Sequence, residues 1–294
     1  MMPGILNGVK LGVLALILTA CSSSLGSPET SVAVGTFNIA WLGDGQDDKQ
    51  PRTDADYLRI ADIIIKSRSD VLAVQEIENE SALRRVLRYM DGYDGFVAAL
   101  SGPQNVGVIY RKDVRVDSVQ TYRPLQLDVP DELRPGLVVR CQKGAFQWVQ
   151  MIVHLKSTSR YDSTIALTEL SRDFRARQVR VLRAWSDSMI ASGTKNVLIT
   201  GDLNDYPQRT KNATLTPLID NSDLKFLTAS LSSCKDHKWH LIDHIVASQG
   251  ASARFVDGSA RTENQFDFLT EEEARGVSDH CPVVVRFSIL DQVN

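Results

Sequence analysis

Hydrophobic and polar residues alternate in short stretches along most of the chain, while other stretches repeat with a helical period. Residues 31–41 (SVAVGTFNIAW) alternate as a strand does, whereas residues 57–67 place their apolar side chains largely on one helical face. Hairpins mixed with strand–helix alternation predict an α/β (α+β) fold in which helices cover mixed sheets. The further predicted strands are 70–76, 105–113, 136–157 (two strands joined by a hairpin turn near Lys143 and Gly144), 196–200, 241–248 and 282–290, and the further predicted helices are 82–90 and 165–191.

The N-terminal segment has the pattern of an export signal. Lys10 precedes the apolar stretch LGVLALILTA, which is too short for the about 20 residues that span a bilayer. We expect a signal peptide at 1–20, a flexible tether at 21–31 and one catalytic domain at 32–290. The words LTAC resemble a bacterial lipobox, so Cys21 is the expected lipidation site. The alternative is plain secretion with cleavage nearby.

Composition and charge leave most function classes open. The 294 residues are 43% hydrophobic and 23% charged, as in ordinary globular proteins, and the formal net charge is −3. No long basic run is present, which argues against a non-specific grip on nucleic acid but not against a local groove for it.

Three cysteines follow Cys21 in the chain. An exported protein permits disulfides, and the odd count leaves at least one thiol unpaired within the chain. Three pairings of Cys141, Cys234 and Cys281 are open from the sequence. We expect a packing role for Cys281, and weigh a nucleophilic role beside His280 less.

Polar side chains recur at the ends of successive predicted strands. A buried carboxylate is costly unless it is paired or bound to a cation, so this recurrence predicts that the side chains converge. Carboxylate and amide oxygens suit Mg²⁺ or Mn²⁺ and not zinc, and histidines beside them can handle protons or charge on a substrate. The residues concerned are Asn38, Glu76, His154, Asp202, Asn204, Asp243, Asp279 and His280.

Six short motifs together resemble the endonuclease/exonuclease/phosphatase superfamily, which includes the DNase I-like enzymes. TFNIAW, VLAVQEIEN, VHLKS, TGDLND, LIDHI and SDHCPV occur in the family's order, between about residues 34 and 287. The resemblance implies a four-layer sandwich of two mixed β-sheets flanked by helices. It also implies metal-dependent hydrolysis of phosphate esters.

The resemblance implies a metal site at the first two strand ends. Glu76 is the expected main ligand, Asn38 helps to bind metal or phosphate, and Asp279 lies near the same ion. Some family members carry a second acid two residues after the Asn, where this chain has Ala40. This departure favours one principal Mg²⁺ or Mn²⁺ ion.

The resemblance also implies the catalytic roles. Asp202 orients or deprotonates the attacking water, and Asn204 holds that water or a phosphate oxygen. His280 binds a non-bridging phosphate oxygen, with Asp243 orienting its ring and keeping it charged. His154 assists the leaving group or the phosphate.

The leading hypothesis is an Mg²⁺-dependent phosphoesterase that is exported and anchored to a membrane through its N-terminal lipid, at the periplasm or cell surface. Its expected substrate is a phosphate ester, and we favour DNA or RNA. The alternatives are a phospholipid or sphingomyelin phosphodiesterase, a small-molecule phosphoesterase, and a binding module that has lost the chemistry. The intact polar set argues against the last.

Three histidines and a tyrosine near these motifs have competing interpretations. His237, His240 and His244 are expected to be surface residues plus one strand-facing imidazole, in preference to a second metal patch. Tyr206 is expected either to stack on a substrate or to pack at the base of its loop.

Overall fold

The computed structural model describes residues 1, 29–98, 102–159, 161–220 and 223–291. The predicted signal peptide beyond Met1, and the predicted lipidation site Cys21, lie outside the described residues. Of the predicted tether, residues 29–31 are described. Within the described ranges, no helix combines the length and apolar character needed to cross a membrane.

The first of two mixed sheets is built around β1. This strand pairs in parallel with β2 and antiparallel with β12. The strands are β1 (Ser31–Leu42), β2 (Val71–Ile77), β3 (Tyr93–Val97), β4 (Asn105–Arg111), β11 (Arg261–Thr262) and β12 (Val283–Ser288), in the order β11-β12-β1-β2-β4-β3.

The second sheet repeats this plan around a parallel pair, β7 and β8. On either side of the pair the neighbours run antiparallel. The strands are β5 (Arg115–Tyr122), β6 (Gly136–Lys143), β7 (Phe146–His154), β8 (Val197–Asp202), β9 (Leu224–Phe226) and β10 (Asp243–Ser248), in the order β5-β6-β7-β8-β10-β9.

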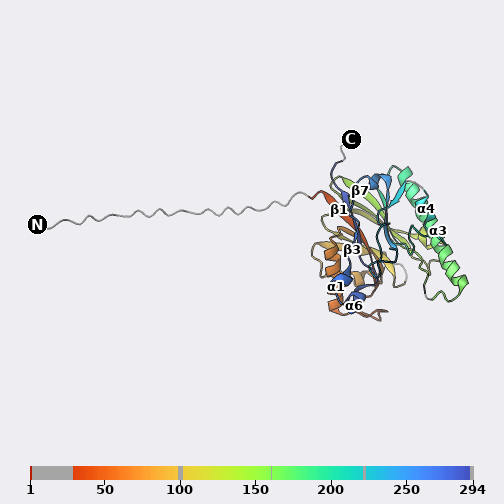
Figure 1. Ribbon diagram of the computed structural model, residues 1–294, viewed down its shortest axis with the longest axis horizontal. Coiled ribbons are helices and arrows are strands. Elements are labelled where there is room, and N and C mark those ends of the chain that lie inside the picture. The colour runs from red at the N-terminus through yellow and green to blue at the C-terminus, as the bar shows by residue number, and fades with distance from the viewer. Residues whose placement is uncertain (2–28, 99–101, 160, 221–222, 292–294) are drawn as a thin grey trace.

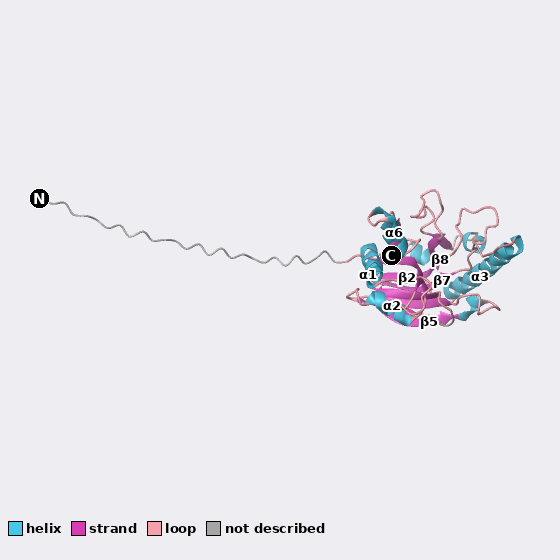
Figure 2. Cartoon of the chain, turned by 90° about the horizontal axis from the view of Figure 1, so that it is seen from below, coloured by secondary structure: helices cyan, strands magenta, loops and turns pink. Residues whose placement is uncertain are grey.

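Helices cover the outer face of each sheet, so the molecule has four layers (Figures 1 and 2). Helices α1, α2 and α6 lie on the side of the first sheet, and α3 and α4 on the side of the second. This confirms the sandwich that the motifs implied. The helices are α1 (Asp54–Ser67), α2 (Glu80–Leu87), α3 (Ile165–Ala191), α4 (Thr216–Ile219), α5 (Gln249–Ser252) and α6 (Glu271–Val277), with 3₁₀ turns η1 (Arg123–Gln126) and η2 (Gln265–Asp267).

The sequence of β2 explains why both faces of its sheet are buried. Val71 and Ala73 point into the cluster between the sheets, while Leu72 and Val74 pack under α1 and α2. Successive side chains of a strand alternate between faces, so an uninterrupted apolar run is what a central strand of a sandwich needs.

The predicted elements all have counterparts, and the strands that were not predicted are short or exposed. The helix predicted from residue 57 begins at Asp54, because Thr53 caps it in a capping box with Asp56. Strand β5 has no buried residue and therefore lacks the apolar alternation that would predict it.

Candidate active site

The two parallel strand pairs bring four polar side chains to one edge of the sandwich. Asn38 near the end of β1 lies opposite Gln75 of β2, and His154 at the end of β7 lies opposite Asp202 of β8. The carboxyl ends of both pairs meet there, because Asn38 Nδ2 donates to Asp202 Oδ2 across the sheets at 3.2 Å. Such strand ends are where α/β proteins place ligands.

The side chains at this edge form one buried cluster. Asn38 Nδ2 also donates to Glu76 Oε1 at 3.2 Å. His154 Nε2 lies 3.6 Å from Asp202 Oδ2 and 3.9 Å from Glu76 Oε1. Glu76 is the most accessible of the four, with 14% of its side chain exposed against 3% for Asp202. The cluster therefore opens to solvent through Glu76.

Unusual backbone angles orient the side chains of this cluster. Glu76 has φ +62°, and Ala40 and Trp41 have φ +46° and +59°, a left-handed region that non-glycine residues seldom adopt. These residues lie where the β1–β2 and β2–β4 registers shift. Trp41 N donates to Glu76 Oε2 at 3.1 Å. Such conformations cost about 1–3 kcal/mol each and persist where the surroundings impose them, as at functional sites.

A buried arginine, which no sequence pattern predicted, supports this backbone. The Arg52 guanidinium donates to the Ile39, Ala40 and Trp41 carbonyls at 2.6–2.9 Å. It also donates to two carbonyls at the end of α6 at 3.1 and 3.2 Å. Arg52 thus fixes the bulge after Asn38 to the segment that leads to His280.

His280 and Asp243 form a charged pair beside the cluster. His280 Nδ1 lies 2.7 Å from Asp243 Oδ2, and Gln265 Nε2 donates to the His280 carbonyl at 2.7 Å. Burial opposes charging of the imidazole, but the Asp243 carboxylate outweighs it and raises the pKa of His280 to about 10. His280 is therefore a cation whose Nε2, 3.9 Å from Asp279 Oδ1, is beyond hydrogen-bond distance of that carboxylate and can donate to an anion.

Asp202 and His154 have the opposite tendency. Burial, with repulsion from Asp243, raises the pKa of Asp202 to about 7. Asn204 N donates to its Oδ1 at 2.8 Å and orients it. Burial, together with the cations Arg134 and His280, holds the pKa of His154 well below its usual range. Asp202 can therefore exchange a proton near neutral pH, while His154 stays neutral.

A sequence profile of the Endonuclease/Exonuclease/phosphatase family matches residues 35–280. The chain belongs to this family. Its fold is similar to that of truncated Caenorhabditis elegans TDP2, with a TM-score of 0.62 and 15% identity over 88% of this chain and 98% of that one. A Bacteroides thetaiotaomicron endonuclease/exonuclease/phosphatase family protein gives 0.60 and 16% over 90% and 99%. The Neisseria 3′ phosphatase NExo, bound to a product DNA hairpin, gives 0.61 and 15% over 87% and 99%. No curated protein sequence matches.

The donor set of this family member suits a hard divalent cation. Carboxylate oxygens of Glu76 and Asp202 meet at the Asn38 amide, whose Nδ2 donates to both while its Oδ1 accepts from Ala40 N, and the buried Oδ1 of Asp243 has no hydrogen-bond partner among the described residues. Ligand atoms of Asp202, Asp243 and His280 also lie within 4.8 Å of one another. Because a charged imidazole donates and does not ligate, we favour the Glu76 end of the cluster for a cation.

The remaining predicted site residues lie around this cluster. Asn204 has φ +52°, and its side-chain amide donates to the Leu155 carbonyl at 3.1 Å. Asp279 lies at the rim, half exposed, where its carboxylate pairs with Lys235 at 3.3 Å. Among the described residues its ion-pair partners are Lys235 and His280 and not Glu76, so its predicted place near the ion stays a prediction.

A second arginine, Arg134, also interacts with the charges of this cluster. The sequence did not predict it. It lies in the loop between η1 and β6. Burial lowers its pKa while Glu76 and Asp202 raise it, and its own charge lowers the pKa of His154. An isolated arginine in a loop of mixed composition carries no sequence signal.

The cysteine pairing and the histidines are settled by the structure. Cys234 and Cys281 form a disulfide, and Cys141 is free and buried. The alternative of a nucleophilic Cys281 is wrong, because its sulfur is bonded to the sulfur of Cys234. His244 is buried on β10, whereas His237 and His240 are exposed.

Proposed function

We propose that this protein is a divalent-metal-dependent phosphoesterase that hydrolyses phosphodiesters of DNA or RNA. One observation carries the proposal: Glu76, Asn38, Asp202 and His154 from four strands share one cluster, beside a charged His280. A phosphodiester is an anion that repels hydroxide. A site for its hydrolysis therefore needs positive charge beside a proton acceptor.

The residues divide this work by their surroundings. His280 Nε2 donates to a non-bridging phosphate oxygen, and Asp243 keeps the ring charged and oriented. Asp202 accepts a proton from the attacking water, with Asn204 N holding its carboxylate in place. His154 orients the leaving oxygen. Glu76 and Asn38 would hold an Mg²⁺ or Mn²⁺ ion, which when bound neutralises phosphate charge.

Nucleic acid is the substrate class that the similar structures favour. The Danio rerio TDP2 structure is a complex with a single-strand DNA product, and NExo is bound to a DNA hairpin. Identities of 15% limit these likenesses to the fold, so the substrate is a proposal for this chain.

An extracytoplasmic location belongs to the same proposal. Disulfides persist in oxidising compartments, and the Cys234–Cys281 bond borders the cluster through its neighbour His280. Together with the lipobox-like LTAC, this supports an exported protein held to a membrane at Cys21, in the periplasm or at the cell surface.

The test is a plasmid-nicking assay with and without EDTA, run beside sphingomyelin and a generic phosphodiester. We expect nicking that EDTA abolishes and Mg²⁺ or Mn²⁺ restores, and a melting temperature that Mg²⁺ raises in wild type but not in Glu76→Gln. Cleavage of sphingomyelin alone would favour the lipid alternative. A folded wild type that is inert on all three substrates would favour the binding module.

A further inference from the structure

A short loop, residues 232–240, reaches over the active-site edge just before β10; we call it the strap. Its ends pair in a bridge between Ser232 and His240. Inside it, Ser233 N donates to the Trp239 carbonyl at 3.0 Å, and Trp239 N donates to the Asp236 carbonyl at 2.9 Å. The strap is therefore a tight loop with its own hydrogen bonds.

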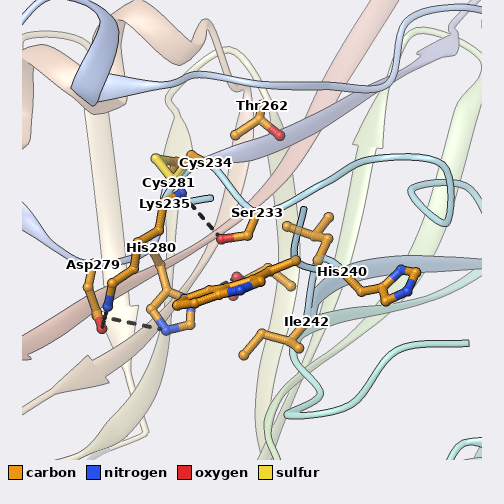
Figure 3. A pocket seen from close by; sticks show the side chains of 12 residues that line it. Ser233, Cys234, Lys235, His240, Ile242, Thr262, Asp279, His280 and Cys281 are labelled. Atoms are coloured by element: carbon orange, nitrogen blue, oxygen red, sulfur yellow. Dashed lines mark hydrogen bonds and ion pairs between the residues drawn. A yellow bond between two sulfur atoms is a disulfide. The ribbon is translucent and has the colours of Figure 1, made fainter. Parts of the chain in front are cut away.

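A disulfide and an ion pair join the strap to the segment that carries His280. Cys234 is bonded to Cys281, and Lys235 Nζ lies 3.3 Å from Asp279 Oδ2 (Figure 3). Asp279 and Cys281 are the two chain neighbours of His280. The strap is thus tied on both sides of the phosphate-binding imidazole.

A third contact, between two stacked rings, joins the strap to the loop after β8. The His240 ring stacks on Tyr206, with centroids 4.2 Å apart and planes at 17°. Tyr206 follows Asp202 and Asn204 in the chain, so the strap also touches the other side of the site. The Tyr206 ring, which the sequence left open as a substrate platform, is covered by His240.

A small pocket lies between the strap and His280. Its volume is about 230 Å³, and its walls include the disulfide, Leu241, Thr262 and the catalytic pair itself (Figure 3). Trp239 also lines it and is 55% exposed. A large aromatic ring left half in water beside an active site is poorly explained by packing, since burial would stabilise it.

The pocket's size and charge select among ligands. It is smaller than the about 300–1,000 Å³ of sites that enclose a drug-sized molecule, so it suits one ring system and not an acyl chain. Its charged walls are balanced, because Lys235 and His280 are paired with the carboxylates of Asp279 and Asp243, so they favour a ligand group that is itself neutral. A nucleobase is neutral, planar and attached to a phosphate, and it stacks on indole rings.

We propose that the strap is a base-stacking subsite, in which Trp239 stacks on an unpaired nucleobase next to the phosphate held at His280. This inference rests on the proposed function and deepens it. A base in a duplex is covered by its neighbours, so a stacking subsite favours single-stranded or frayed ends. The disulfide keeps the indole at a fixed place relative to His280.

The test measures binding separately from hydrolysis. Fluorescence anisotropy of a labelled single-stranded oligothymidylate in EDTA gives affinity without turnover. We expect Trp239→Ala to bind about tenfold more weakly than wild type, the loss expected of one stacking contact, and Trp239→Phe to recover most of it. Phe96→Ala is the matched control, because Phe96 is also an exposed aromatic but lies on edge strand β3.

A second readout separates this inference from the proposed function. Thymidine 5′-(p-nitrophenyl phosphate) and methyl p-nitrophenyl phosphate share a leaving group but differ by a nucleoside. Trp239→Ala should lower kcat/KM for the first about tenfold and leave the second unchanged. Equal effects on both esters, or unchanged oligothymidylate binding, would overturn the subsite. Absence of hydrolysis in wild type, with binding still dependent on Trp239, would refute the proposed function alone.

Discussion

Asp202 and Asp205 are buried carboxylates three positions apart with different surroundings. Asp205 accepts hydrogen bonds from Thr214 N and Oγ1 at 3.0 and 2.7 Å, and it pairs with Arg209. Asp202 has Asn38, Asn204 N and the repelling carboxylate Asp243 as neighbours. The first is fully paired within the protein, while the second is left able to take a proton.

This contrast predicts different effects for one kind of substitution. Asp202→Asn should lower kcat about 100- to 10,000-fold with little change in melting temperature, since it removes only the proton acceptor. Asp205→Asn should lower the melting temperature by several degrees and kcat much less. Steady-state kinetics and thermal unfolding of both variants measure this. An active Asp202→Asn enzyme would remove Asp202 from the chemistry.

The pKa of His280 predicts how stability depends on pH. The folded pKa, about 10, lies above the ordinary 6.5, so the charged pair stabilises the fold fully below about pH 6.5. That stability declines as pH rises and is gone above about pH 10. In Asp243→Asn the decline should be smaller. Melting temperatures between pH 8 and 10, where Asp202 is ionised in both proteins, give the comparison, and parallel curves would contradict it.

The sequence predicted which residue types lie at the cluster but not what holds them there. Glu76 and Asp202 stand out because a carboxylate at the end of an apolar strand is costly to bury unless it is paired or bound to a cation. Arg52 and Gln265 act through backbone carbonyls far away in the chain, and this depends on the folded path of the bulge. No local pattern encodes such contacts.

At the scale of elements, the disulfide closes a loop across a separation of 47 residues. Chain-entropy arguments assign such a loop about 4 kcal/mol of stability. The double variant Cys234→Ser/Cys281→Ser should therefore lose about that much free energy of unfolding in urea. The control is Cys141→Ala, which keeps the disulfide and should still be destabilised by a reducing agent. A double variant as stable as wild type would mean that the strap is held by its other contacts.

Central strands could be predicted from sequence, whereas peripheral ones could not. β2 and β8 are buried on both faces and read as apolar runs. β9 and β11 have three and two residues, too few for any periodicity. The strap itself has no regular pattern, and its pairing with Cys281 was one of three open choices.

At the scale of the whole molecule, charge limits how nucleic acid is held. The net charge is −3 and no long basic run occurs. We therefore expect a strand to meet few cations, and we take His280, Arg134 and Lys235 as those at the site. Three phosphate contacts give a slope of log affinity against log salt of about −2 for single strands. Oligothymidylate affinity between 50 and 200 mM salt measures it. A slope steeper than about −5 would reveal a basic track.

Strand β1 joins the start of the described domain to its chemistry. It begins at Ser31 and reaches Asn38 seven residues later, a rise of about 23 Å through the centre of the first sheet. The start of the described domain therefore lies at the opposite end of β1 from the cluster. If the protein is immobilised through its N-terminus, we expect the active-site cluster to face the bulk medium and to remain accessible to long polymers.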